Sequence, residues 1–400
     1  MTNILFVLNL YPGFGGIETV TNILVEWLSR YYNVHTVSFT GQKEAPLPKA
    51  IAGHHIFPSE VPAENVAFYN QLVEQLSPAV VFNQGMFLNI AEVVFNEQRD
   101  KSVPVVSCLH GMPGYERFNF WNLPFVKSAS PRSRRRWAWK QKLGICRHYN
   151  NYLDLFRTRY TAMYRSSAAV VVLCEPYISE FSRFCRLDDG GARVIAIPNP
   201  LPPRFGNVKV AAWKDRRNEV LFVGRLSEEK RVDLLIKLWM QVKNRRGWKL
   251  VIVGDGDRRN ELKSLTSSLG LDDVEFAGAT DAPERYYAKA KYVVLTSKFE
   301  GFGMCLIEGM AYGDIPMAFN VSSGLKSIID HSGGRLIGNG KDRRFVRALS
   351  QAIHSNKNRD KESKKAYDKA NMYDVDRIGP QWRELIERVS KQKNEGNFIK

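Results

Sequence analysis

Short runs of apolar residues alternate along this chain with stretches that repeat apolar side chains at helical spacing. The first strand is expected at Ile4–Leu8, followed by a helix and a second strand at Val34–Phe39. A continuous apolar run of this length is typical of a strand buried on both faces of a parallel sheet. The alternation therefore predicts a doubly wound α/β fold. Further strands of the first half are expected at Ala79–Asn83, Val103–Leu109, Ala168–Cys174 and Arg193–Ile197.

A proline-rich stretch interrupts the alternation near the middle of the chain. Residues 198–203 read Pro-Asn-Pro-Leu-Pro-Pro, which cannot continue a helix or a strand. The 400 residues also exceed what one core usually holds. We predict two Rossmann-like domains, residues 1–200 and 201–372, and a helix in residues 373–400 that packs back on the first domain. In the second domain we expect strands at Glu219–Val223, Lys249–Val253, Val274–Phe276, Tyr292–Thr296 and Ile315–Phe319, with helices near Val232–Val242, Arg258–Leu269, Glu284–Ala290 and Met304–Ala311.

The net charge limits the possible partners, and the cysteine content limits the possible cellular compartment. Lys and Arg number 58 against 41 Asp and Glu, a net charge of +17. This excess implies an acidic partner, which nucleic acid, an anionic membrane or a phosphorylated substrate would each satisfy. The five cysteines lack metal-type spacing and indicate a reducing compartment. The N-terminus reads as a strand rather than a signal peptide, and no apolar run approaches the roughly 20 residues that span a bilayer. We expect a cytoplasmic protein.

A glycine-rich turn follows the first expected strand. Gly13, Gly15 and Gly16 stand immediately before the first helix. Backbone N–H groups and the helix dipole attract an anion at such a point. The glycine spacing differs from the dinucleotide-binding fingerprint. Two interpretations stay open, namely a phosphate or substrate site at the carboxyl edge of the sheet and a tight strand-to-helix turn.

Two cations follow the first strand of the second domain. Arg225 stands directly after Gly224, and Lys230 follows five residues later. Both would lie at the carboxyl edge of the sheet, where open α/β folds bind ligands. A guanidinium and an ammonium there could hold a diphosphate without a metal. Ser227 is expected to cap the next helix. The alternative is a pair of solvated surface cations.

Two glutamates stand eight residues apart further along the chain. Glu300 opens a Glu-Gly-Phe-Gly turn, and Glu308 lies in an apolar helix. A carboxylate among apolar side chains is costly unless it meets hydrogen-bond donors, and a ribose diol offers two. Glu300 could accept from sugar hydroxyls. An ion pair within the domain stays open, as does a hydrolase-like pair flanking a glycosidic bond. Cations at one end and carboxylates at the other favour a nucleotide-sugar ligand.

Four motifs occur in order along nearly the whole chain, and together they carry a family resemblance. They are Gly15-Gly16-Ile17-Glu18, Val223-Gly224-Arg225-Leu226 with Lys230, Val253-Gly254-Asp255-Gly256, and Glu300 to Glu308. The set resembles the retaining glycosyltransferases of group 1 (family 4), whose GT-B fold has two Rossmann-like domains facing across a cleft. The resemblance implies transfer of a sugar from a nucleotide diphosphate, UDP-hexose or UDP-N-acetylhexosamine before a GDP-sugar. The implied acceptor is a glycan or lipid-linked glycan of lipopolysaccharide, capsule or another surface polysaccharide. A non-catalytic glycan-binding relative is the alternative.

The resemblance also implies a role for each matching residue. The catalytic group would be Arg225, Lys230, Glu300 and His110. The donor-binding group would be Gly16, Gly224, Arg225, Lys230, Gly301, Phe302, Gly303 and Glu308. The acceptor side would hold Gly15 and Glu18. A satisfied strand-end histidine is the alternative for His110, and helix capping is the alternative for Glu18. No cofactor or metal is expected because the two cations supply positive charge, although Asp255-Gly256-Asp257 leaves a metal open.

One segment, residues 115–165, breaks the alternation. From Lys127 to Arg165 there are eleven Lys or Arg and a single acid, Asp154, with aromatic residues interleaved. Four interpretations stay open: a face that docks on an anionic membrane, a groove for a phosphate-bearing acceptor, a nucleic-acid site, and a helical excursion with an aromatic core. The resemblance favours membrane contact and no nucleic-acid partner.

Overall fold

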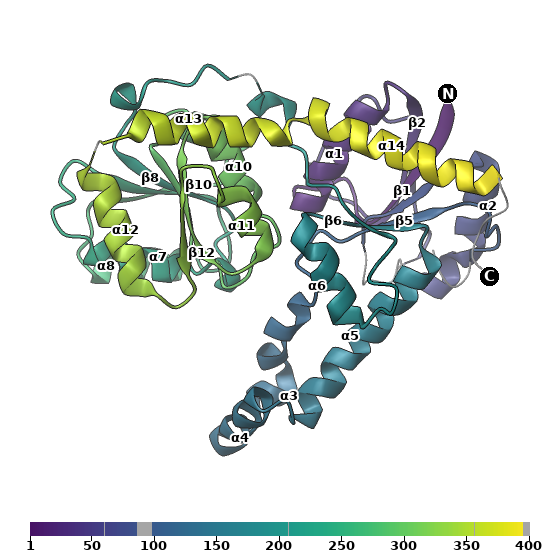
Figure 1. Cartoon of the computed structure of the whole chain (residues 1–400), viewed down its shortest axis with the longest axis horizontal. Coiled ribbons are helices and arrows are strands. Elements are labelled where there is room, and N and C mark those ends of the chain that lie inside the picture. The colour runs from purple at the N-terminus through teal and green to yellow at the C-terminus, as the bar shows by residue number, and fades with distance from the viewer. Residues whose placement is uncertain (60, 86–97, 207, 356, 395–400) are drawn as a thin grey trace. The chain divides into compact units, whose positions relative to one another are not determined.

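The computed structural model describes residues 1–59, 61–85, 98–206, 208–355 and 357–394. The chain divides into two compact units (Figure 1). Unit 1 comprises Met1–Pro198 and Ile378–Lys400, and unit 2 comprises Asn199–Arg377. The first division lies inside the proline-rich stretch, close to the predicted boundary at residue 200. The second lies five residues beyond the predicted boundary at residue 372.

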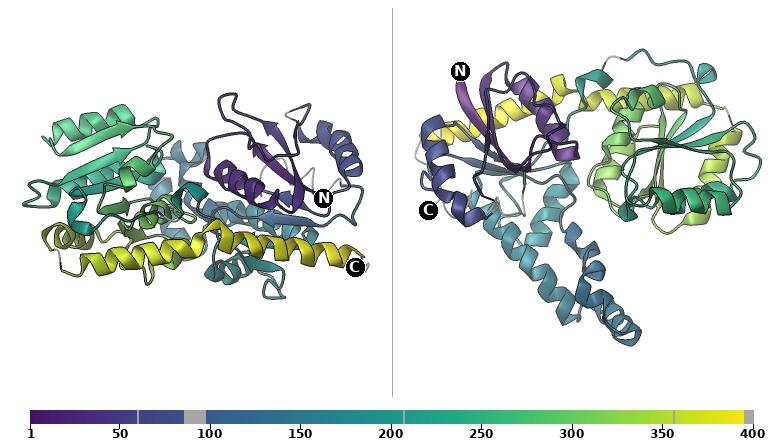
Figure 2. Two further views of the ribbon diagram at one scale, coloured as in Figure 1. Left: turned by 90° about the horizontal axis from the view of Figure 1, so that it is seen from above. Right: turned by 180° about the vertical axis from the view of Figure 1, so that it is seen from behind.

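Unit 1 is built on a parallel sheet with the strand order β3-β2-β1-β4-β5-β6-β7. Its strands are β1 (Thr2–Leu10), β2 (Tyr32–Thr40), β3 (Gly53–Ile56), β4 (Val81–Asn83), β5 (Val105–Cys108), β6 (Ala169–Val172) and β7 (Val194–Ala196). Its helices include α1 (Gly16–Leu28), α2 (Val66–Leu76), α5 (Arg147–Ser166), α6 (Glu175–Cys185) and all but the first three residues of α14 (Val375–Asn394). Helices lie on both faces of each sheet (Figure 2).

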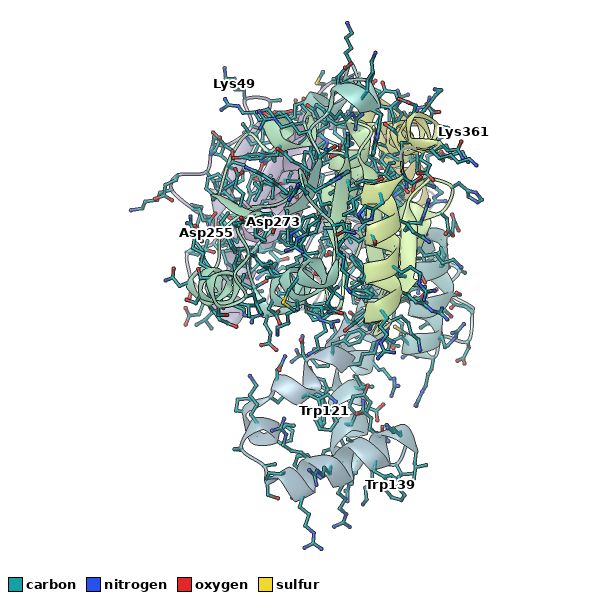
Figure 3. All side chains as sticks on the ribbon, turned by 90° about the vertical axis from the view of Figure 1, so that its left-hand side faces the viewer. Lys49, Trp121, Trp139, Asp255, Asp273 and Lys361 are labelled. Carbon is teal, nitrogen blue, oxygen red and sulfur yellow. The ribbon has the colours of Figure 1, made fainter. Side chains whose placement is uncertain are left out.

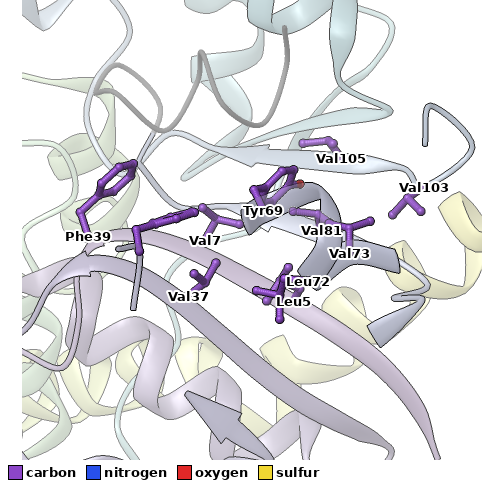
Figure 4. Close-up of a cluster of buried hydrophobic side chains, with 11 residues drawn as sticks. Leu5, Val7, Val37, Phe39, Tyr69, Leu72, Val73, Val81, Val103 and Val105 are labelled. Atoms are coloured by element: carbon purple, nitrogen blue, oxygen red, sulfur yellow. The ribbon is translucent and has the colours of Figure 1, made fainter. Parts of the chain in front are cut away.

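A hydrophobic cluster between the sheet and α2 forms part of the core of unit 1 (Figure 4). Leu5 and Val7 of β1 are fully buried there, and Tyr69 of α2 packs against them. The C-terminal helix contributes a second contact region. Trp382 of α14 meets Phe82 of β4 edge to face, with 5.6 Å between ring centroids. The C-terminal helix is therefore part of this unit's core.

Unit 2 repeats the architecture with the strand order β10-β9-β8-β11-β12-β13, all pairs parallel. Its strands are β8 (Glu219–Val223), β9 (Lys249–Val253), β10 (Val274–Gly278), β11 (Tyr292–Leu295), β12 (Ile315–Asn320) and β13 (Arg335–Gly338). Its helices are α7 (Val232–Gln241), α8 (Arg259–Ser268), α9 (Glu284–Tyr287), α10 (Met304–Ala311), α11 (Ser323–Ile329), α12 (Asp342–His354) and α13 (Arg359–Ala370). The predicted α/β class with two doubly wound sheets is confirmed.

Between β5 and β6 the chain leaves the sheet and forms a helical arm that projects from unit 1 (Figure 1). The arm contains α3 (Pro124–Lys127), α4 (Pro131–Lys142) and α5, the last of which runs back to the sheet. Among the residues that the structure describes, none of the helices has both the length and the apolar character that crossing a membrane requires.

A buried carboxyl at the base of this arm gives a testable pH dependence. Glu116 is only 2% exposed, and one of its oxygens accepts a 2.9 Å hydrogen bond from the Tyr160 hydroxyl. Burial raises the pKa of Glu116 to about 7, although the Tyr160 bond acts in the opposite sense. Because the folded-state pKa lies above the unfolded one, near 4.5, stability from this group is complete below pH 4.5 and is lost as the pH rises through 7.

We therefore expect Glu116→Gln to raise the melting temperature at pH 8 by several degrees, through relief of about 3 kcal/mol. At pH 4.5 the same substitution should have little effect, because the native carboxyl is already protonated. Thermal unfolding of both proteins at the two pH values measures the difference. An equal shift at both values would contradict the assignment.

Candidate functional site

The connections in unit 2 reverse direction between β8 and β11, and open α/β sheets bind ligands beside such a point. The loop after β8 carries residues 224–230, and the loop after β11 carries residues 296–303. The Lys298 amide donates a 2.7 Å hydrogen bond to the Glu229 carbonyl and ties the two loops together. The predicted cations and the first predicted glutamate therefore share one location on unit 2.

Lys230 and Glu300 form an ion pair at this location. The Lys230 ammonium nitrogen lies 2.6 Å from a Glu300 carboxylate oxygen, and the two side chains are 23% and 14% exposed. The Ser297 hydroxyl donates to the same oxygen at 3.3 Å. Burial lowers the pKa of Lys230, but the Glu300 carboxylate, together with Cys305 and Glu229, outweighs burial and the pKa is raised. The ammonium thus stays charged.

Glu308 is half-buried on α10, and its carboxylate meets a hydroxyl donor. The donor is the fully buried Tyr287, whose hydroxyl lies 2.9 Å from one carboxylate oxygen. Burial raises the pKa of Glu308, and the Tyr287 bond and the charge of Arg204 oppose that rise. The sequence argument required a hydroxyl partner for this carboxylate, and within the chain Tyr287 supplies one. A carboxylate has acceptor capacity for further hydroxyls.

Cys305 connects these groups. Its thiol lies in the first turn of α10, and burial raises its pKa. The charges of Lys230, Glu300 and Glu308 all act on this thiol. All three charged side chains therefore lie within electrostatic range of the same partly buried thiol.

Arg225 belongs to the same loop as Lys230 and is exposed. In the described parts of the chain its guanidinium has no hydrogen bond or ion pair. The turn that carries it is fixed from beneath, because the Leu226 amide donates to the Asp255 carbonyl at 2.8 Å. A Cβ atom at Gly254 would lie 2.0 Å from the Gly224 carbonyl oxygen, so only glycine permits this approach of the two turns. Arg225 is a free cation on a firmly held turn.

Two details of the loops differ from expectation or add to it. The predicted cap at Ser227 is wrong, because the buried Ser227 hydroxyl makes no capping bond to the short helix Glu228–Lys230. Phe302 is buried and packs edge to face on Tyr373, so its side chain stabilises the fold. Gly303 has φ +84°, and a Cβ atom there would lie 2.6 Å from Leu325. Donor contacts by Gly301, Phe302 and Gly303 stay predictions.

The predicted metal alternative rests on Asp255 and Asp257. Asp255 pairs with Arg259 at 2.7 Å and accepts from the Gly256 amide at 2.8 Å. Within the described residues, no three His, Cys, Asp or Glu side chains gather as a metal site would need. The expectation that no metal takes part stays a prediction.

A second basic region of unit 2 lies at the opposite edge of the sheet. A cavity of about 790 Å³ opens at the amino ends of β8 and β9, with Lys291 in its wall. Lys291 is buried, bonds to Asn218 at 2.7 Å and lies over the Trp213 ring. Arg216, also in the wall, donates to the Tyr312 carbonyl at the end of α10. Helix carboxyl ends attract cations, so Arg216 has a structural reason to lie here.

The glycine turn of unit 1 leads directly into α1, with Gly15 at the N-cap and Gly16 as the first helical residue. Glu18 lies in the first turn, and a Cβ atom at Gly15 would be 2.1 Å from its carboxylate oxygen. The carboxylate therefore folds back over Gly15, which fits the capping interpretation of Glu18. The structure brings Gly15 and Glu18 together, and their acceptor-side role stays a prediction.

Gly16 has no packing reason to be glycine. A Cβ atom there would meet nothing within 4 Å apart from its own helix and its chain neighbours, and its backbone is helical. We expect Gly16→Ala to leave the melting temperature unchanged or slightly higher. If donor phosphates approach this position, the added methyl group should displace them and lower activity by a factor on the order of 10². Unchanged activity in a folded Gly16→Ala protein would remove Gly16 from the site.

His110 lies just beyond β5, and its Nε2 is hydrogen-bonded to the side-chain oxygen of Gln84. Gln84 follows the neighbouring strand β4 and is 1% exposed. Because an amide oxygen only accepts, Nε2 carries the proton in this pair. The histidine is thus held at the carboxyl edge of the sheet of unit 1.

Three partners of the predicted residues were not predicted from the sequence. Gln84 could have been found by the rule that selected His110, since it too stands directly after a strand. Ser297 stands directly after the predicted strand Tyr292–Thr296 and could have been found in the same way. Tyr287 gives no such signal, because a tyrosine hydroxyl serves equally well in many places. Only the fold brings Tyr287 to Glu308.

Comparisons with known proteins agree with this geometry. Residues 206–369 match the family model of glycosyl transferases group 1. The chain is 30% identical over 172 residues to the amylovoran biosynthesis glycosyltransferase AmsD of Erwinia amylovora, covering 43% of this chain and 48% of that one. It is 29% identical over 178 residues to an alpha-1,4-N-acetyl-D-galactosaminyltransferase of Campylobacter jejuni whose name includes a PP-undecaprenol-linked saccharide, covering 44% and 49%. The chain thus spans about half the length of the curated relatives it matches.

Solved structures match over nearly the whole chain. The lipopolysaccharide outer core galactosyltransferase WaaB superimposes with a TM-score of 0.68 at 19% identity, covering 97% of this chain and 99% of that one. HepE of Anabaena, in complex with UDP-glucose, gives 0.74 at 17% identity, covering 97% and 100%. Fold and motifs define a protein of the GT-B class. The match of residues 206–369 makes this part of the chain similar to the group 1 glycosyl transferases.

Proposed function

We propose that this protein is a retaining glycosyltransferase that moves a sugar from a UDP-activated donor to a glycan or lipid-linked glycan during synthesis of a bacterial surface polysaccharide. One observation carries the proposal. Lys230 and Glu300 form an ion pair on the loops beside β8 and β11, Glu308 of the adjoining helix α10 acts on the same Cys305 thiol as this pair, and Arg225 stands on the loop that carries Lys230. Cations for a diphosphate and carboxylates for hydroxyls are the groups a nucleotide-sugar needs.

The donor would be held by exchange of partners within this cluster. An arriving diphosphate competes with Glu300 for Lys230, and the released carboxylate can then accept hydrogen bonds from sugar hydroxyls. Glu308 already has one hydroxyl partner and would take the ribose diol with its remaining acceptor positions. A UDP-hexose or UDP-N-acetylhexosamine is preferred to a GDP-sugar because HepE, which shares the fold, was solved with UDP-glucose.

Transfer would proceed by attack on the same face as the leaving group. The bond between the anomeric carbon and the phosphate oxygen breaks, and the acceptor oxygen forms the new bond to that carbon. The departing phosphate takes the acceptor proton, so no protein base is required. Negative charge grows on the diphosphate as it leaves, and Arg225 and Lys230 stabilise it. His110, Gly15, Gly16 and Glu18 are the residues that we assign to the sugar, phosphate and acceptor in unit 1.

The proposed acceptor sets the location. AmsD is named for amylovoran biosynthesis, and the Campylobacter relative for a saccharide on PP-undecaprenol. An acceptor of the second kind is anchored in a bilayer, so the protein would work as a peripheral protein on the inner face of the cytoplasmic membrane. Neither a metal cofactor nor a nucleic-acid partner is part of the proposal.

A thermal-shift screen with UDP-, GDP- and ADP-sugars tests the donor assignment. A ligand at 100 times its dissociation constant adds about 2.7 kcal/mol to stability, which raises the melting temperature by several degrees. We expect the largest shift from a UDP-sugar, and transfer from that donor should survive excess EDTA. A larger shift from a GDP-sugar would mean that the donor nucleotide is GDP and not UDP. No shift from any of these sugars would favour a non-catalytic glycan-binding protein.

A further inference from the structure

The helical arm of unit 1 has an inner aromatic core and an outer face. The exposed apolar side chains of the outer face do not contribute to the packing of that core. Phe120 is fully buried and packs against Trp121, Tyr149 and Tyr152. Trp137 of α4 joins this group through Phe125, with 6.3 Å between ring centroids. Most of the aromatic residues therefore form the arm's own core, as the helical-excursion interpretation expected.

Trp139 lies on the opposite side of α4 from Trp137. Successive helical residues are about 100° apart, so positions two residues apart face in widely different directions. Trp139 is 61% exposed, and Leu143 and Ile145 just beyond the helix are 54% and 57% exposed. Figure 3 shows Trp139 at the end of the arm remote from the rest of unit 1, with Trp121 closer in. Three large apolar side chains within seven residues are thus exposed.

Cations share this outer face. Arg132, Arg135 and Arg136 fall on the same side of the helix as Trp139, three to seven residues before it, and all three are exposed. None of them has an ion pair within the described residues. The one acid of the arm from Lys127 to Arg165, Asp154, is already paired with Arg157 at 2.6 Å.

Packing within the chain contributes little to the stability of α4. None of its twelve residues is buried. Its formation is supported locally, because the Ser130 hydroxyl accepts from the Ser133 amide at 3.2 Å and Pro131 occupies the first turn. A helix of this length with only partly buried contacts, such as that of Trp137, is marginal alone, so its exposed apolar side chains point to a partner outside the chain.

We propose that this outer face of α4, formed by Arg132, Arg135, Arg136, Trp139 and Leu143, docks the protein on anionic lipid headgroups. Arginine side chains on an anionic surface, with tryptophan and leucine at the boundary of the hydrocarbon, are the features of an interfacial amphipathic helix. A soluble polyanion would satisfy the cations and leave the apolar side chains in water. The inference deepens the proposed function by naming the partner surface of an enzyme with a bilayer-anchored acceptor.

Vesicle co-sedimentation of the full chain tests the proposal. The protein should bind mixed phosphatidylglycerol–phosphatidylcholine vesicles, bind pure phosphatidylcholine weakly, and be released by high salt. The triple variant Arg132→Gln, Arg135→Gln, Arg136→Gln should lose affinity on the order of 100-fold, at about 1 kcal/mol per cation. Trp139→Ala should lose roughly tenfold through its apolar contact.

A charge-matched control distinguishes the effect of the outer face of α4 from the effect of net charge. Lys49→Gln, Lys361→Gln, Lys365→Gln removes three exposed cations elsewhere, so both triple variants carry +14 instead of +17. We expect the control to bind vesicles almost as well as the natural protein. Equal loss in both triple variants would overturn the proposal, as would binding to heparin but not to vesicles. UDP-sugar thermal shifts, unchanged in all these variants, report separately on the donor site of unit 2.

Discussion

Replacing Arg225 with alanine should lower the rate of sugar transfer by a factor on the order of 10²–10³ without changing the melting temperature. The guanidinium is exposed and has no partner in the described residues, so folding does not depend on it. Its proposed partner exists only when a nucleotide-sugar is bound, and its contribution grows as the diphosphate gains charge. Steady-state rates and thermal unfolding of the same preparations measure both effects.

Lys230→Ala should reduce the rate to a similar extent but also lower stability, because it leaves the largely buried Glu300 carboxylate without its cation. The two variants therefore share a kinetic defect and differ in melting temperature. Arg246→Ala is the control, an exposed arginine of unit 2 that stands before β9, at the other edge of the sheet. If Arg225→Ala turns over normally while folded, the diphosphate does not lie at this turn.

Asp314→Ala should destabilise unit 2 by about 3–5 kcal/mol. Asp314 and Arg216 form an ion pair at 3.2 Å with side chains 0% and 1% exposed. Burial raises the pKa of Asp314 and lowers that of Arg216, so for both groups desolvation outweighs attraction. The intact pair adds little to the stability of unit 2. Removing Asp314 alone, however, leaves the buried charge of Arg216 without its partner.

Thermal or denaturant unfolding measures that loss, which corresponds to a fall of roughly 6–20 °C for a unit of this size. Asp368→Ala provides the comparison, because the Lys364–Asp368 pair is 74% and 55% exposed and should contribute less than 1 kcal/mol. Combining Asp314→Leu with Arg216→Met should recover much of the stability, since an apolar pair of similar volume avoids desolvation. A single Asp314→Ala variant as stable as the natural protein would refute this account.

The parts of the fold that the sequence predicts best are those buried on both sides. Glu219–Val223, Lys249–Val253 and the helix Met304–Ala311 are found at the predicted residues. In the two strands the apolar run is continuous and lies between a charged residue and a glycine. The two missed strands, β3 (Gly53–Ile56) and β13 (Arg335–Gly338), are edge strands with largely half-buried or exposed residues. An edge strand needs no continuous apolar run, so its sequence carries little signal.

The candidate site was predictable in its residue types but not in its pairings. Lys230 and Glu300 are separated by 70 positions, and a sequence gives no distance between two loops. The rule that ligands lie at the carboxyl ends of strands placed both on one edge. Which charge neutralises which in the absence of ligand depends on the local packing of the two loops. Tyr287 illustrates the same limit, because nothing near it in the sequence marks it as the partner of Glu308.

The contact between the turns at Gly224 and Gly254 has a consequence for ligand capture. The backbone that presents Arg225 is fixed before any nucleotide arrives, by the bond from Leu226 to Asp255 and by an approach that a methyl group would prevent. The loop backbone therefore loses little conformational entropy when a ligand binds, and only the Arg225 side chain has to become ordered. Attempts to change donor preference should leave Gly254 intact, because a larger residue there would displace the turn that carries Arg225 and weaken the binding of every donor.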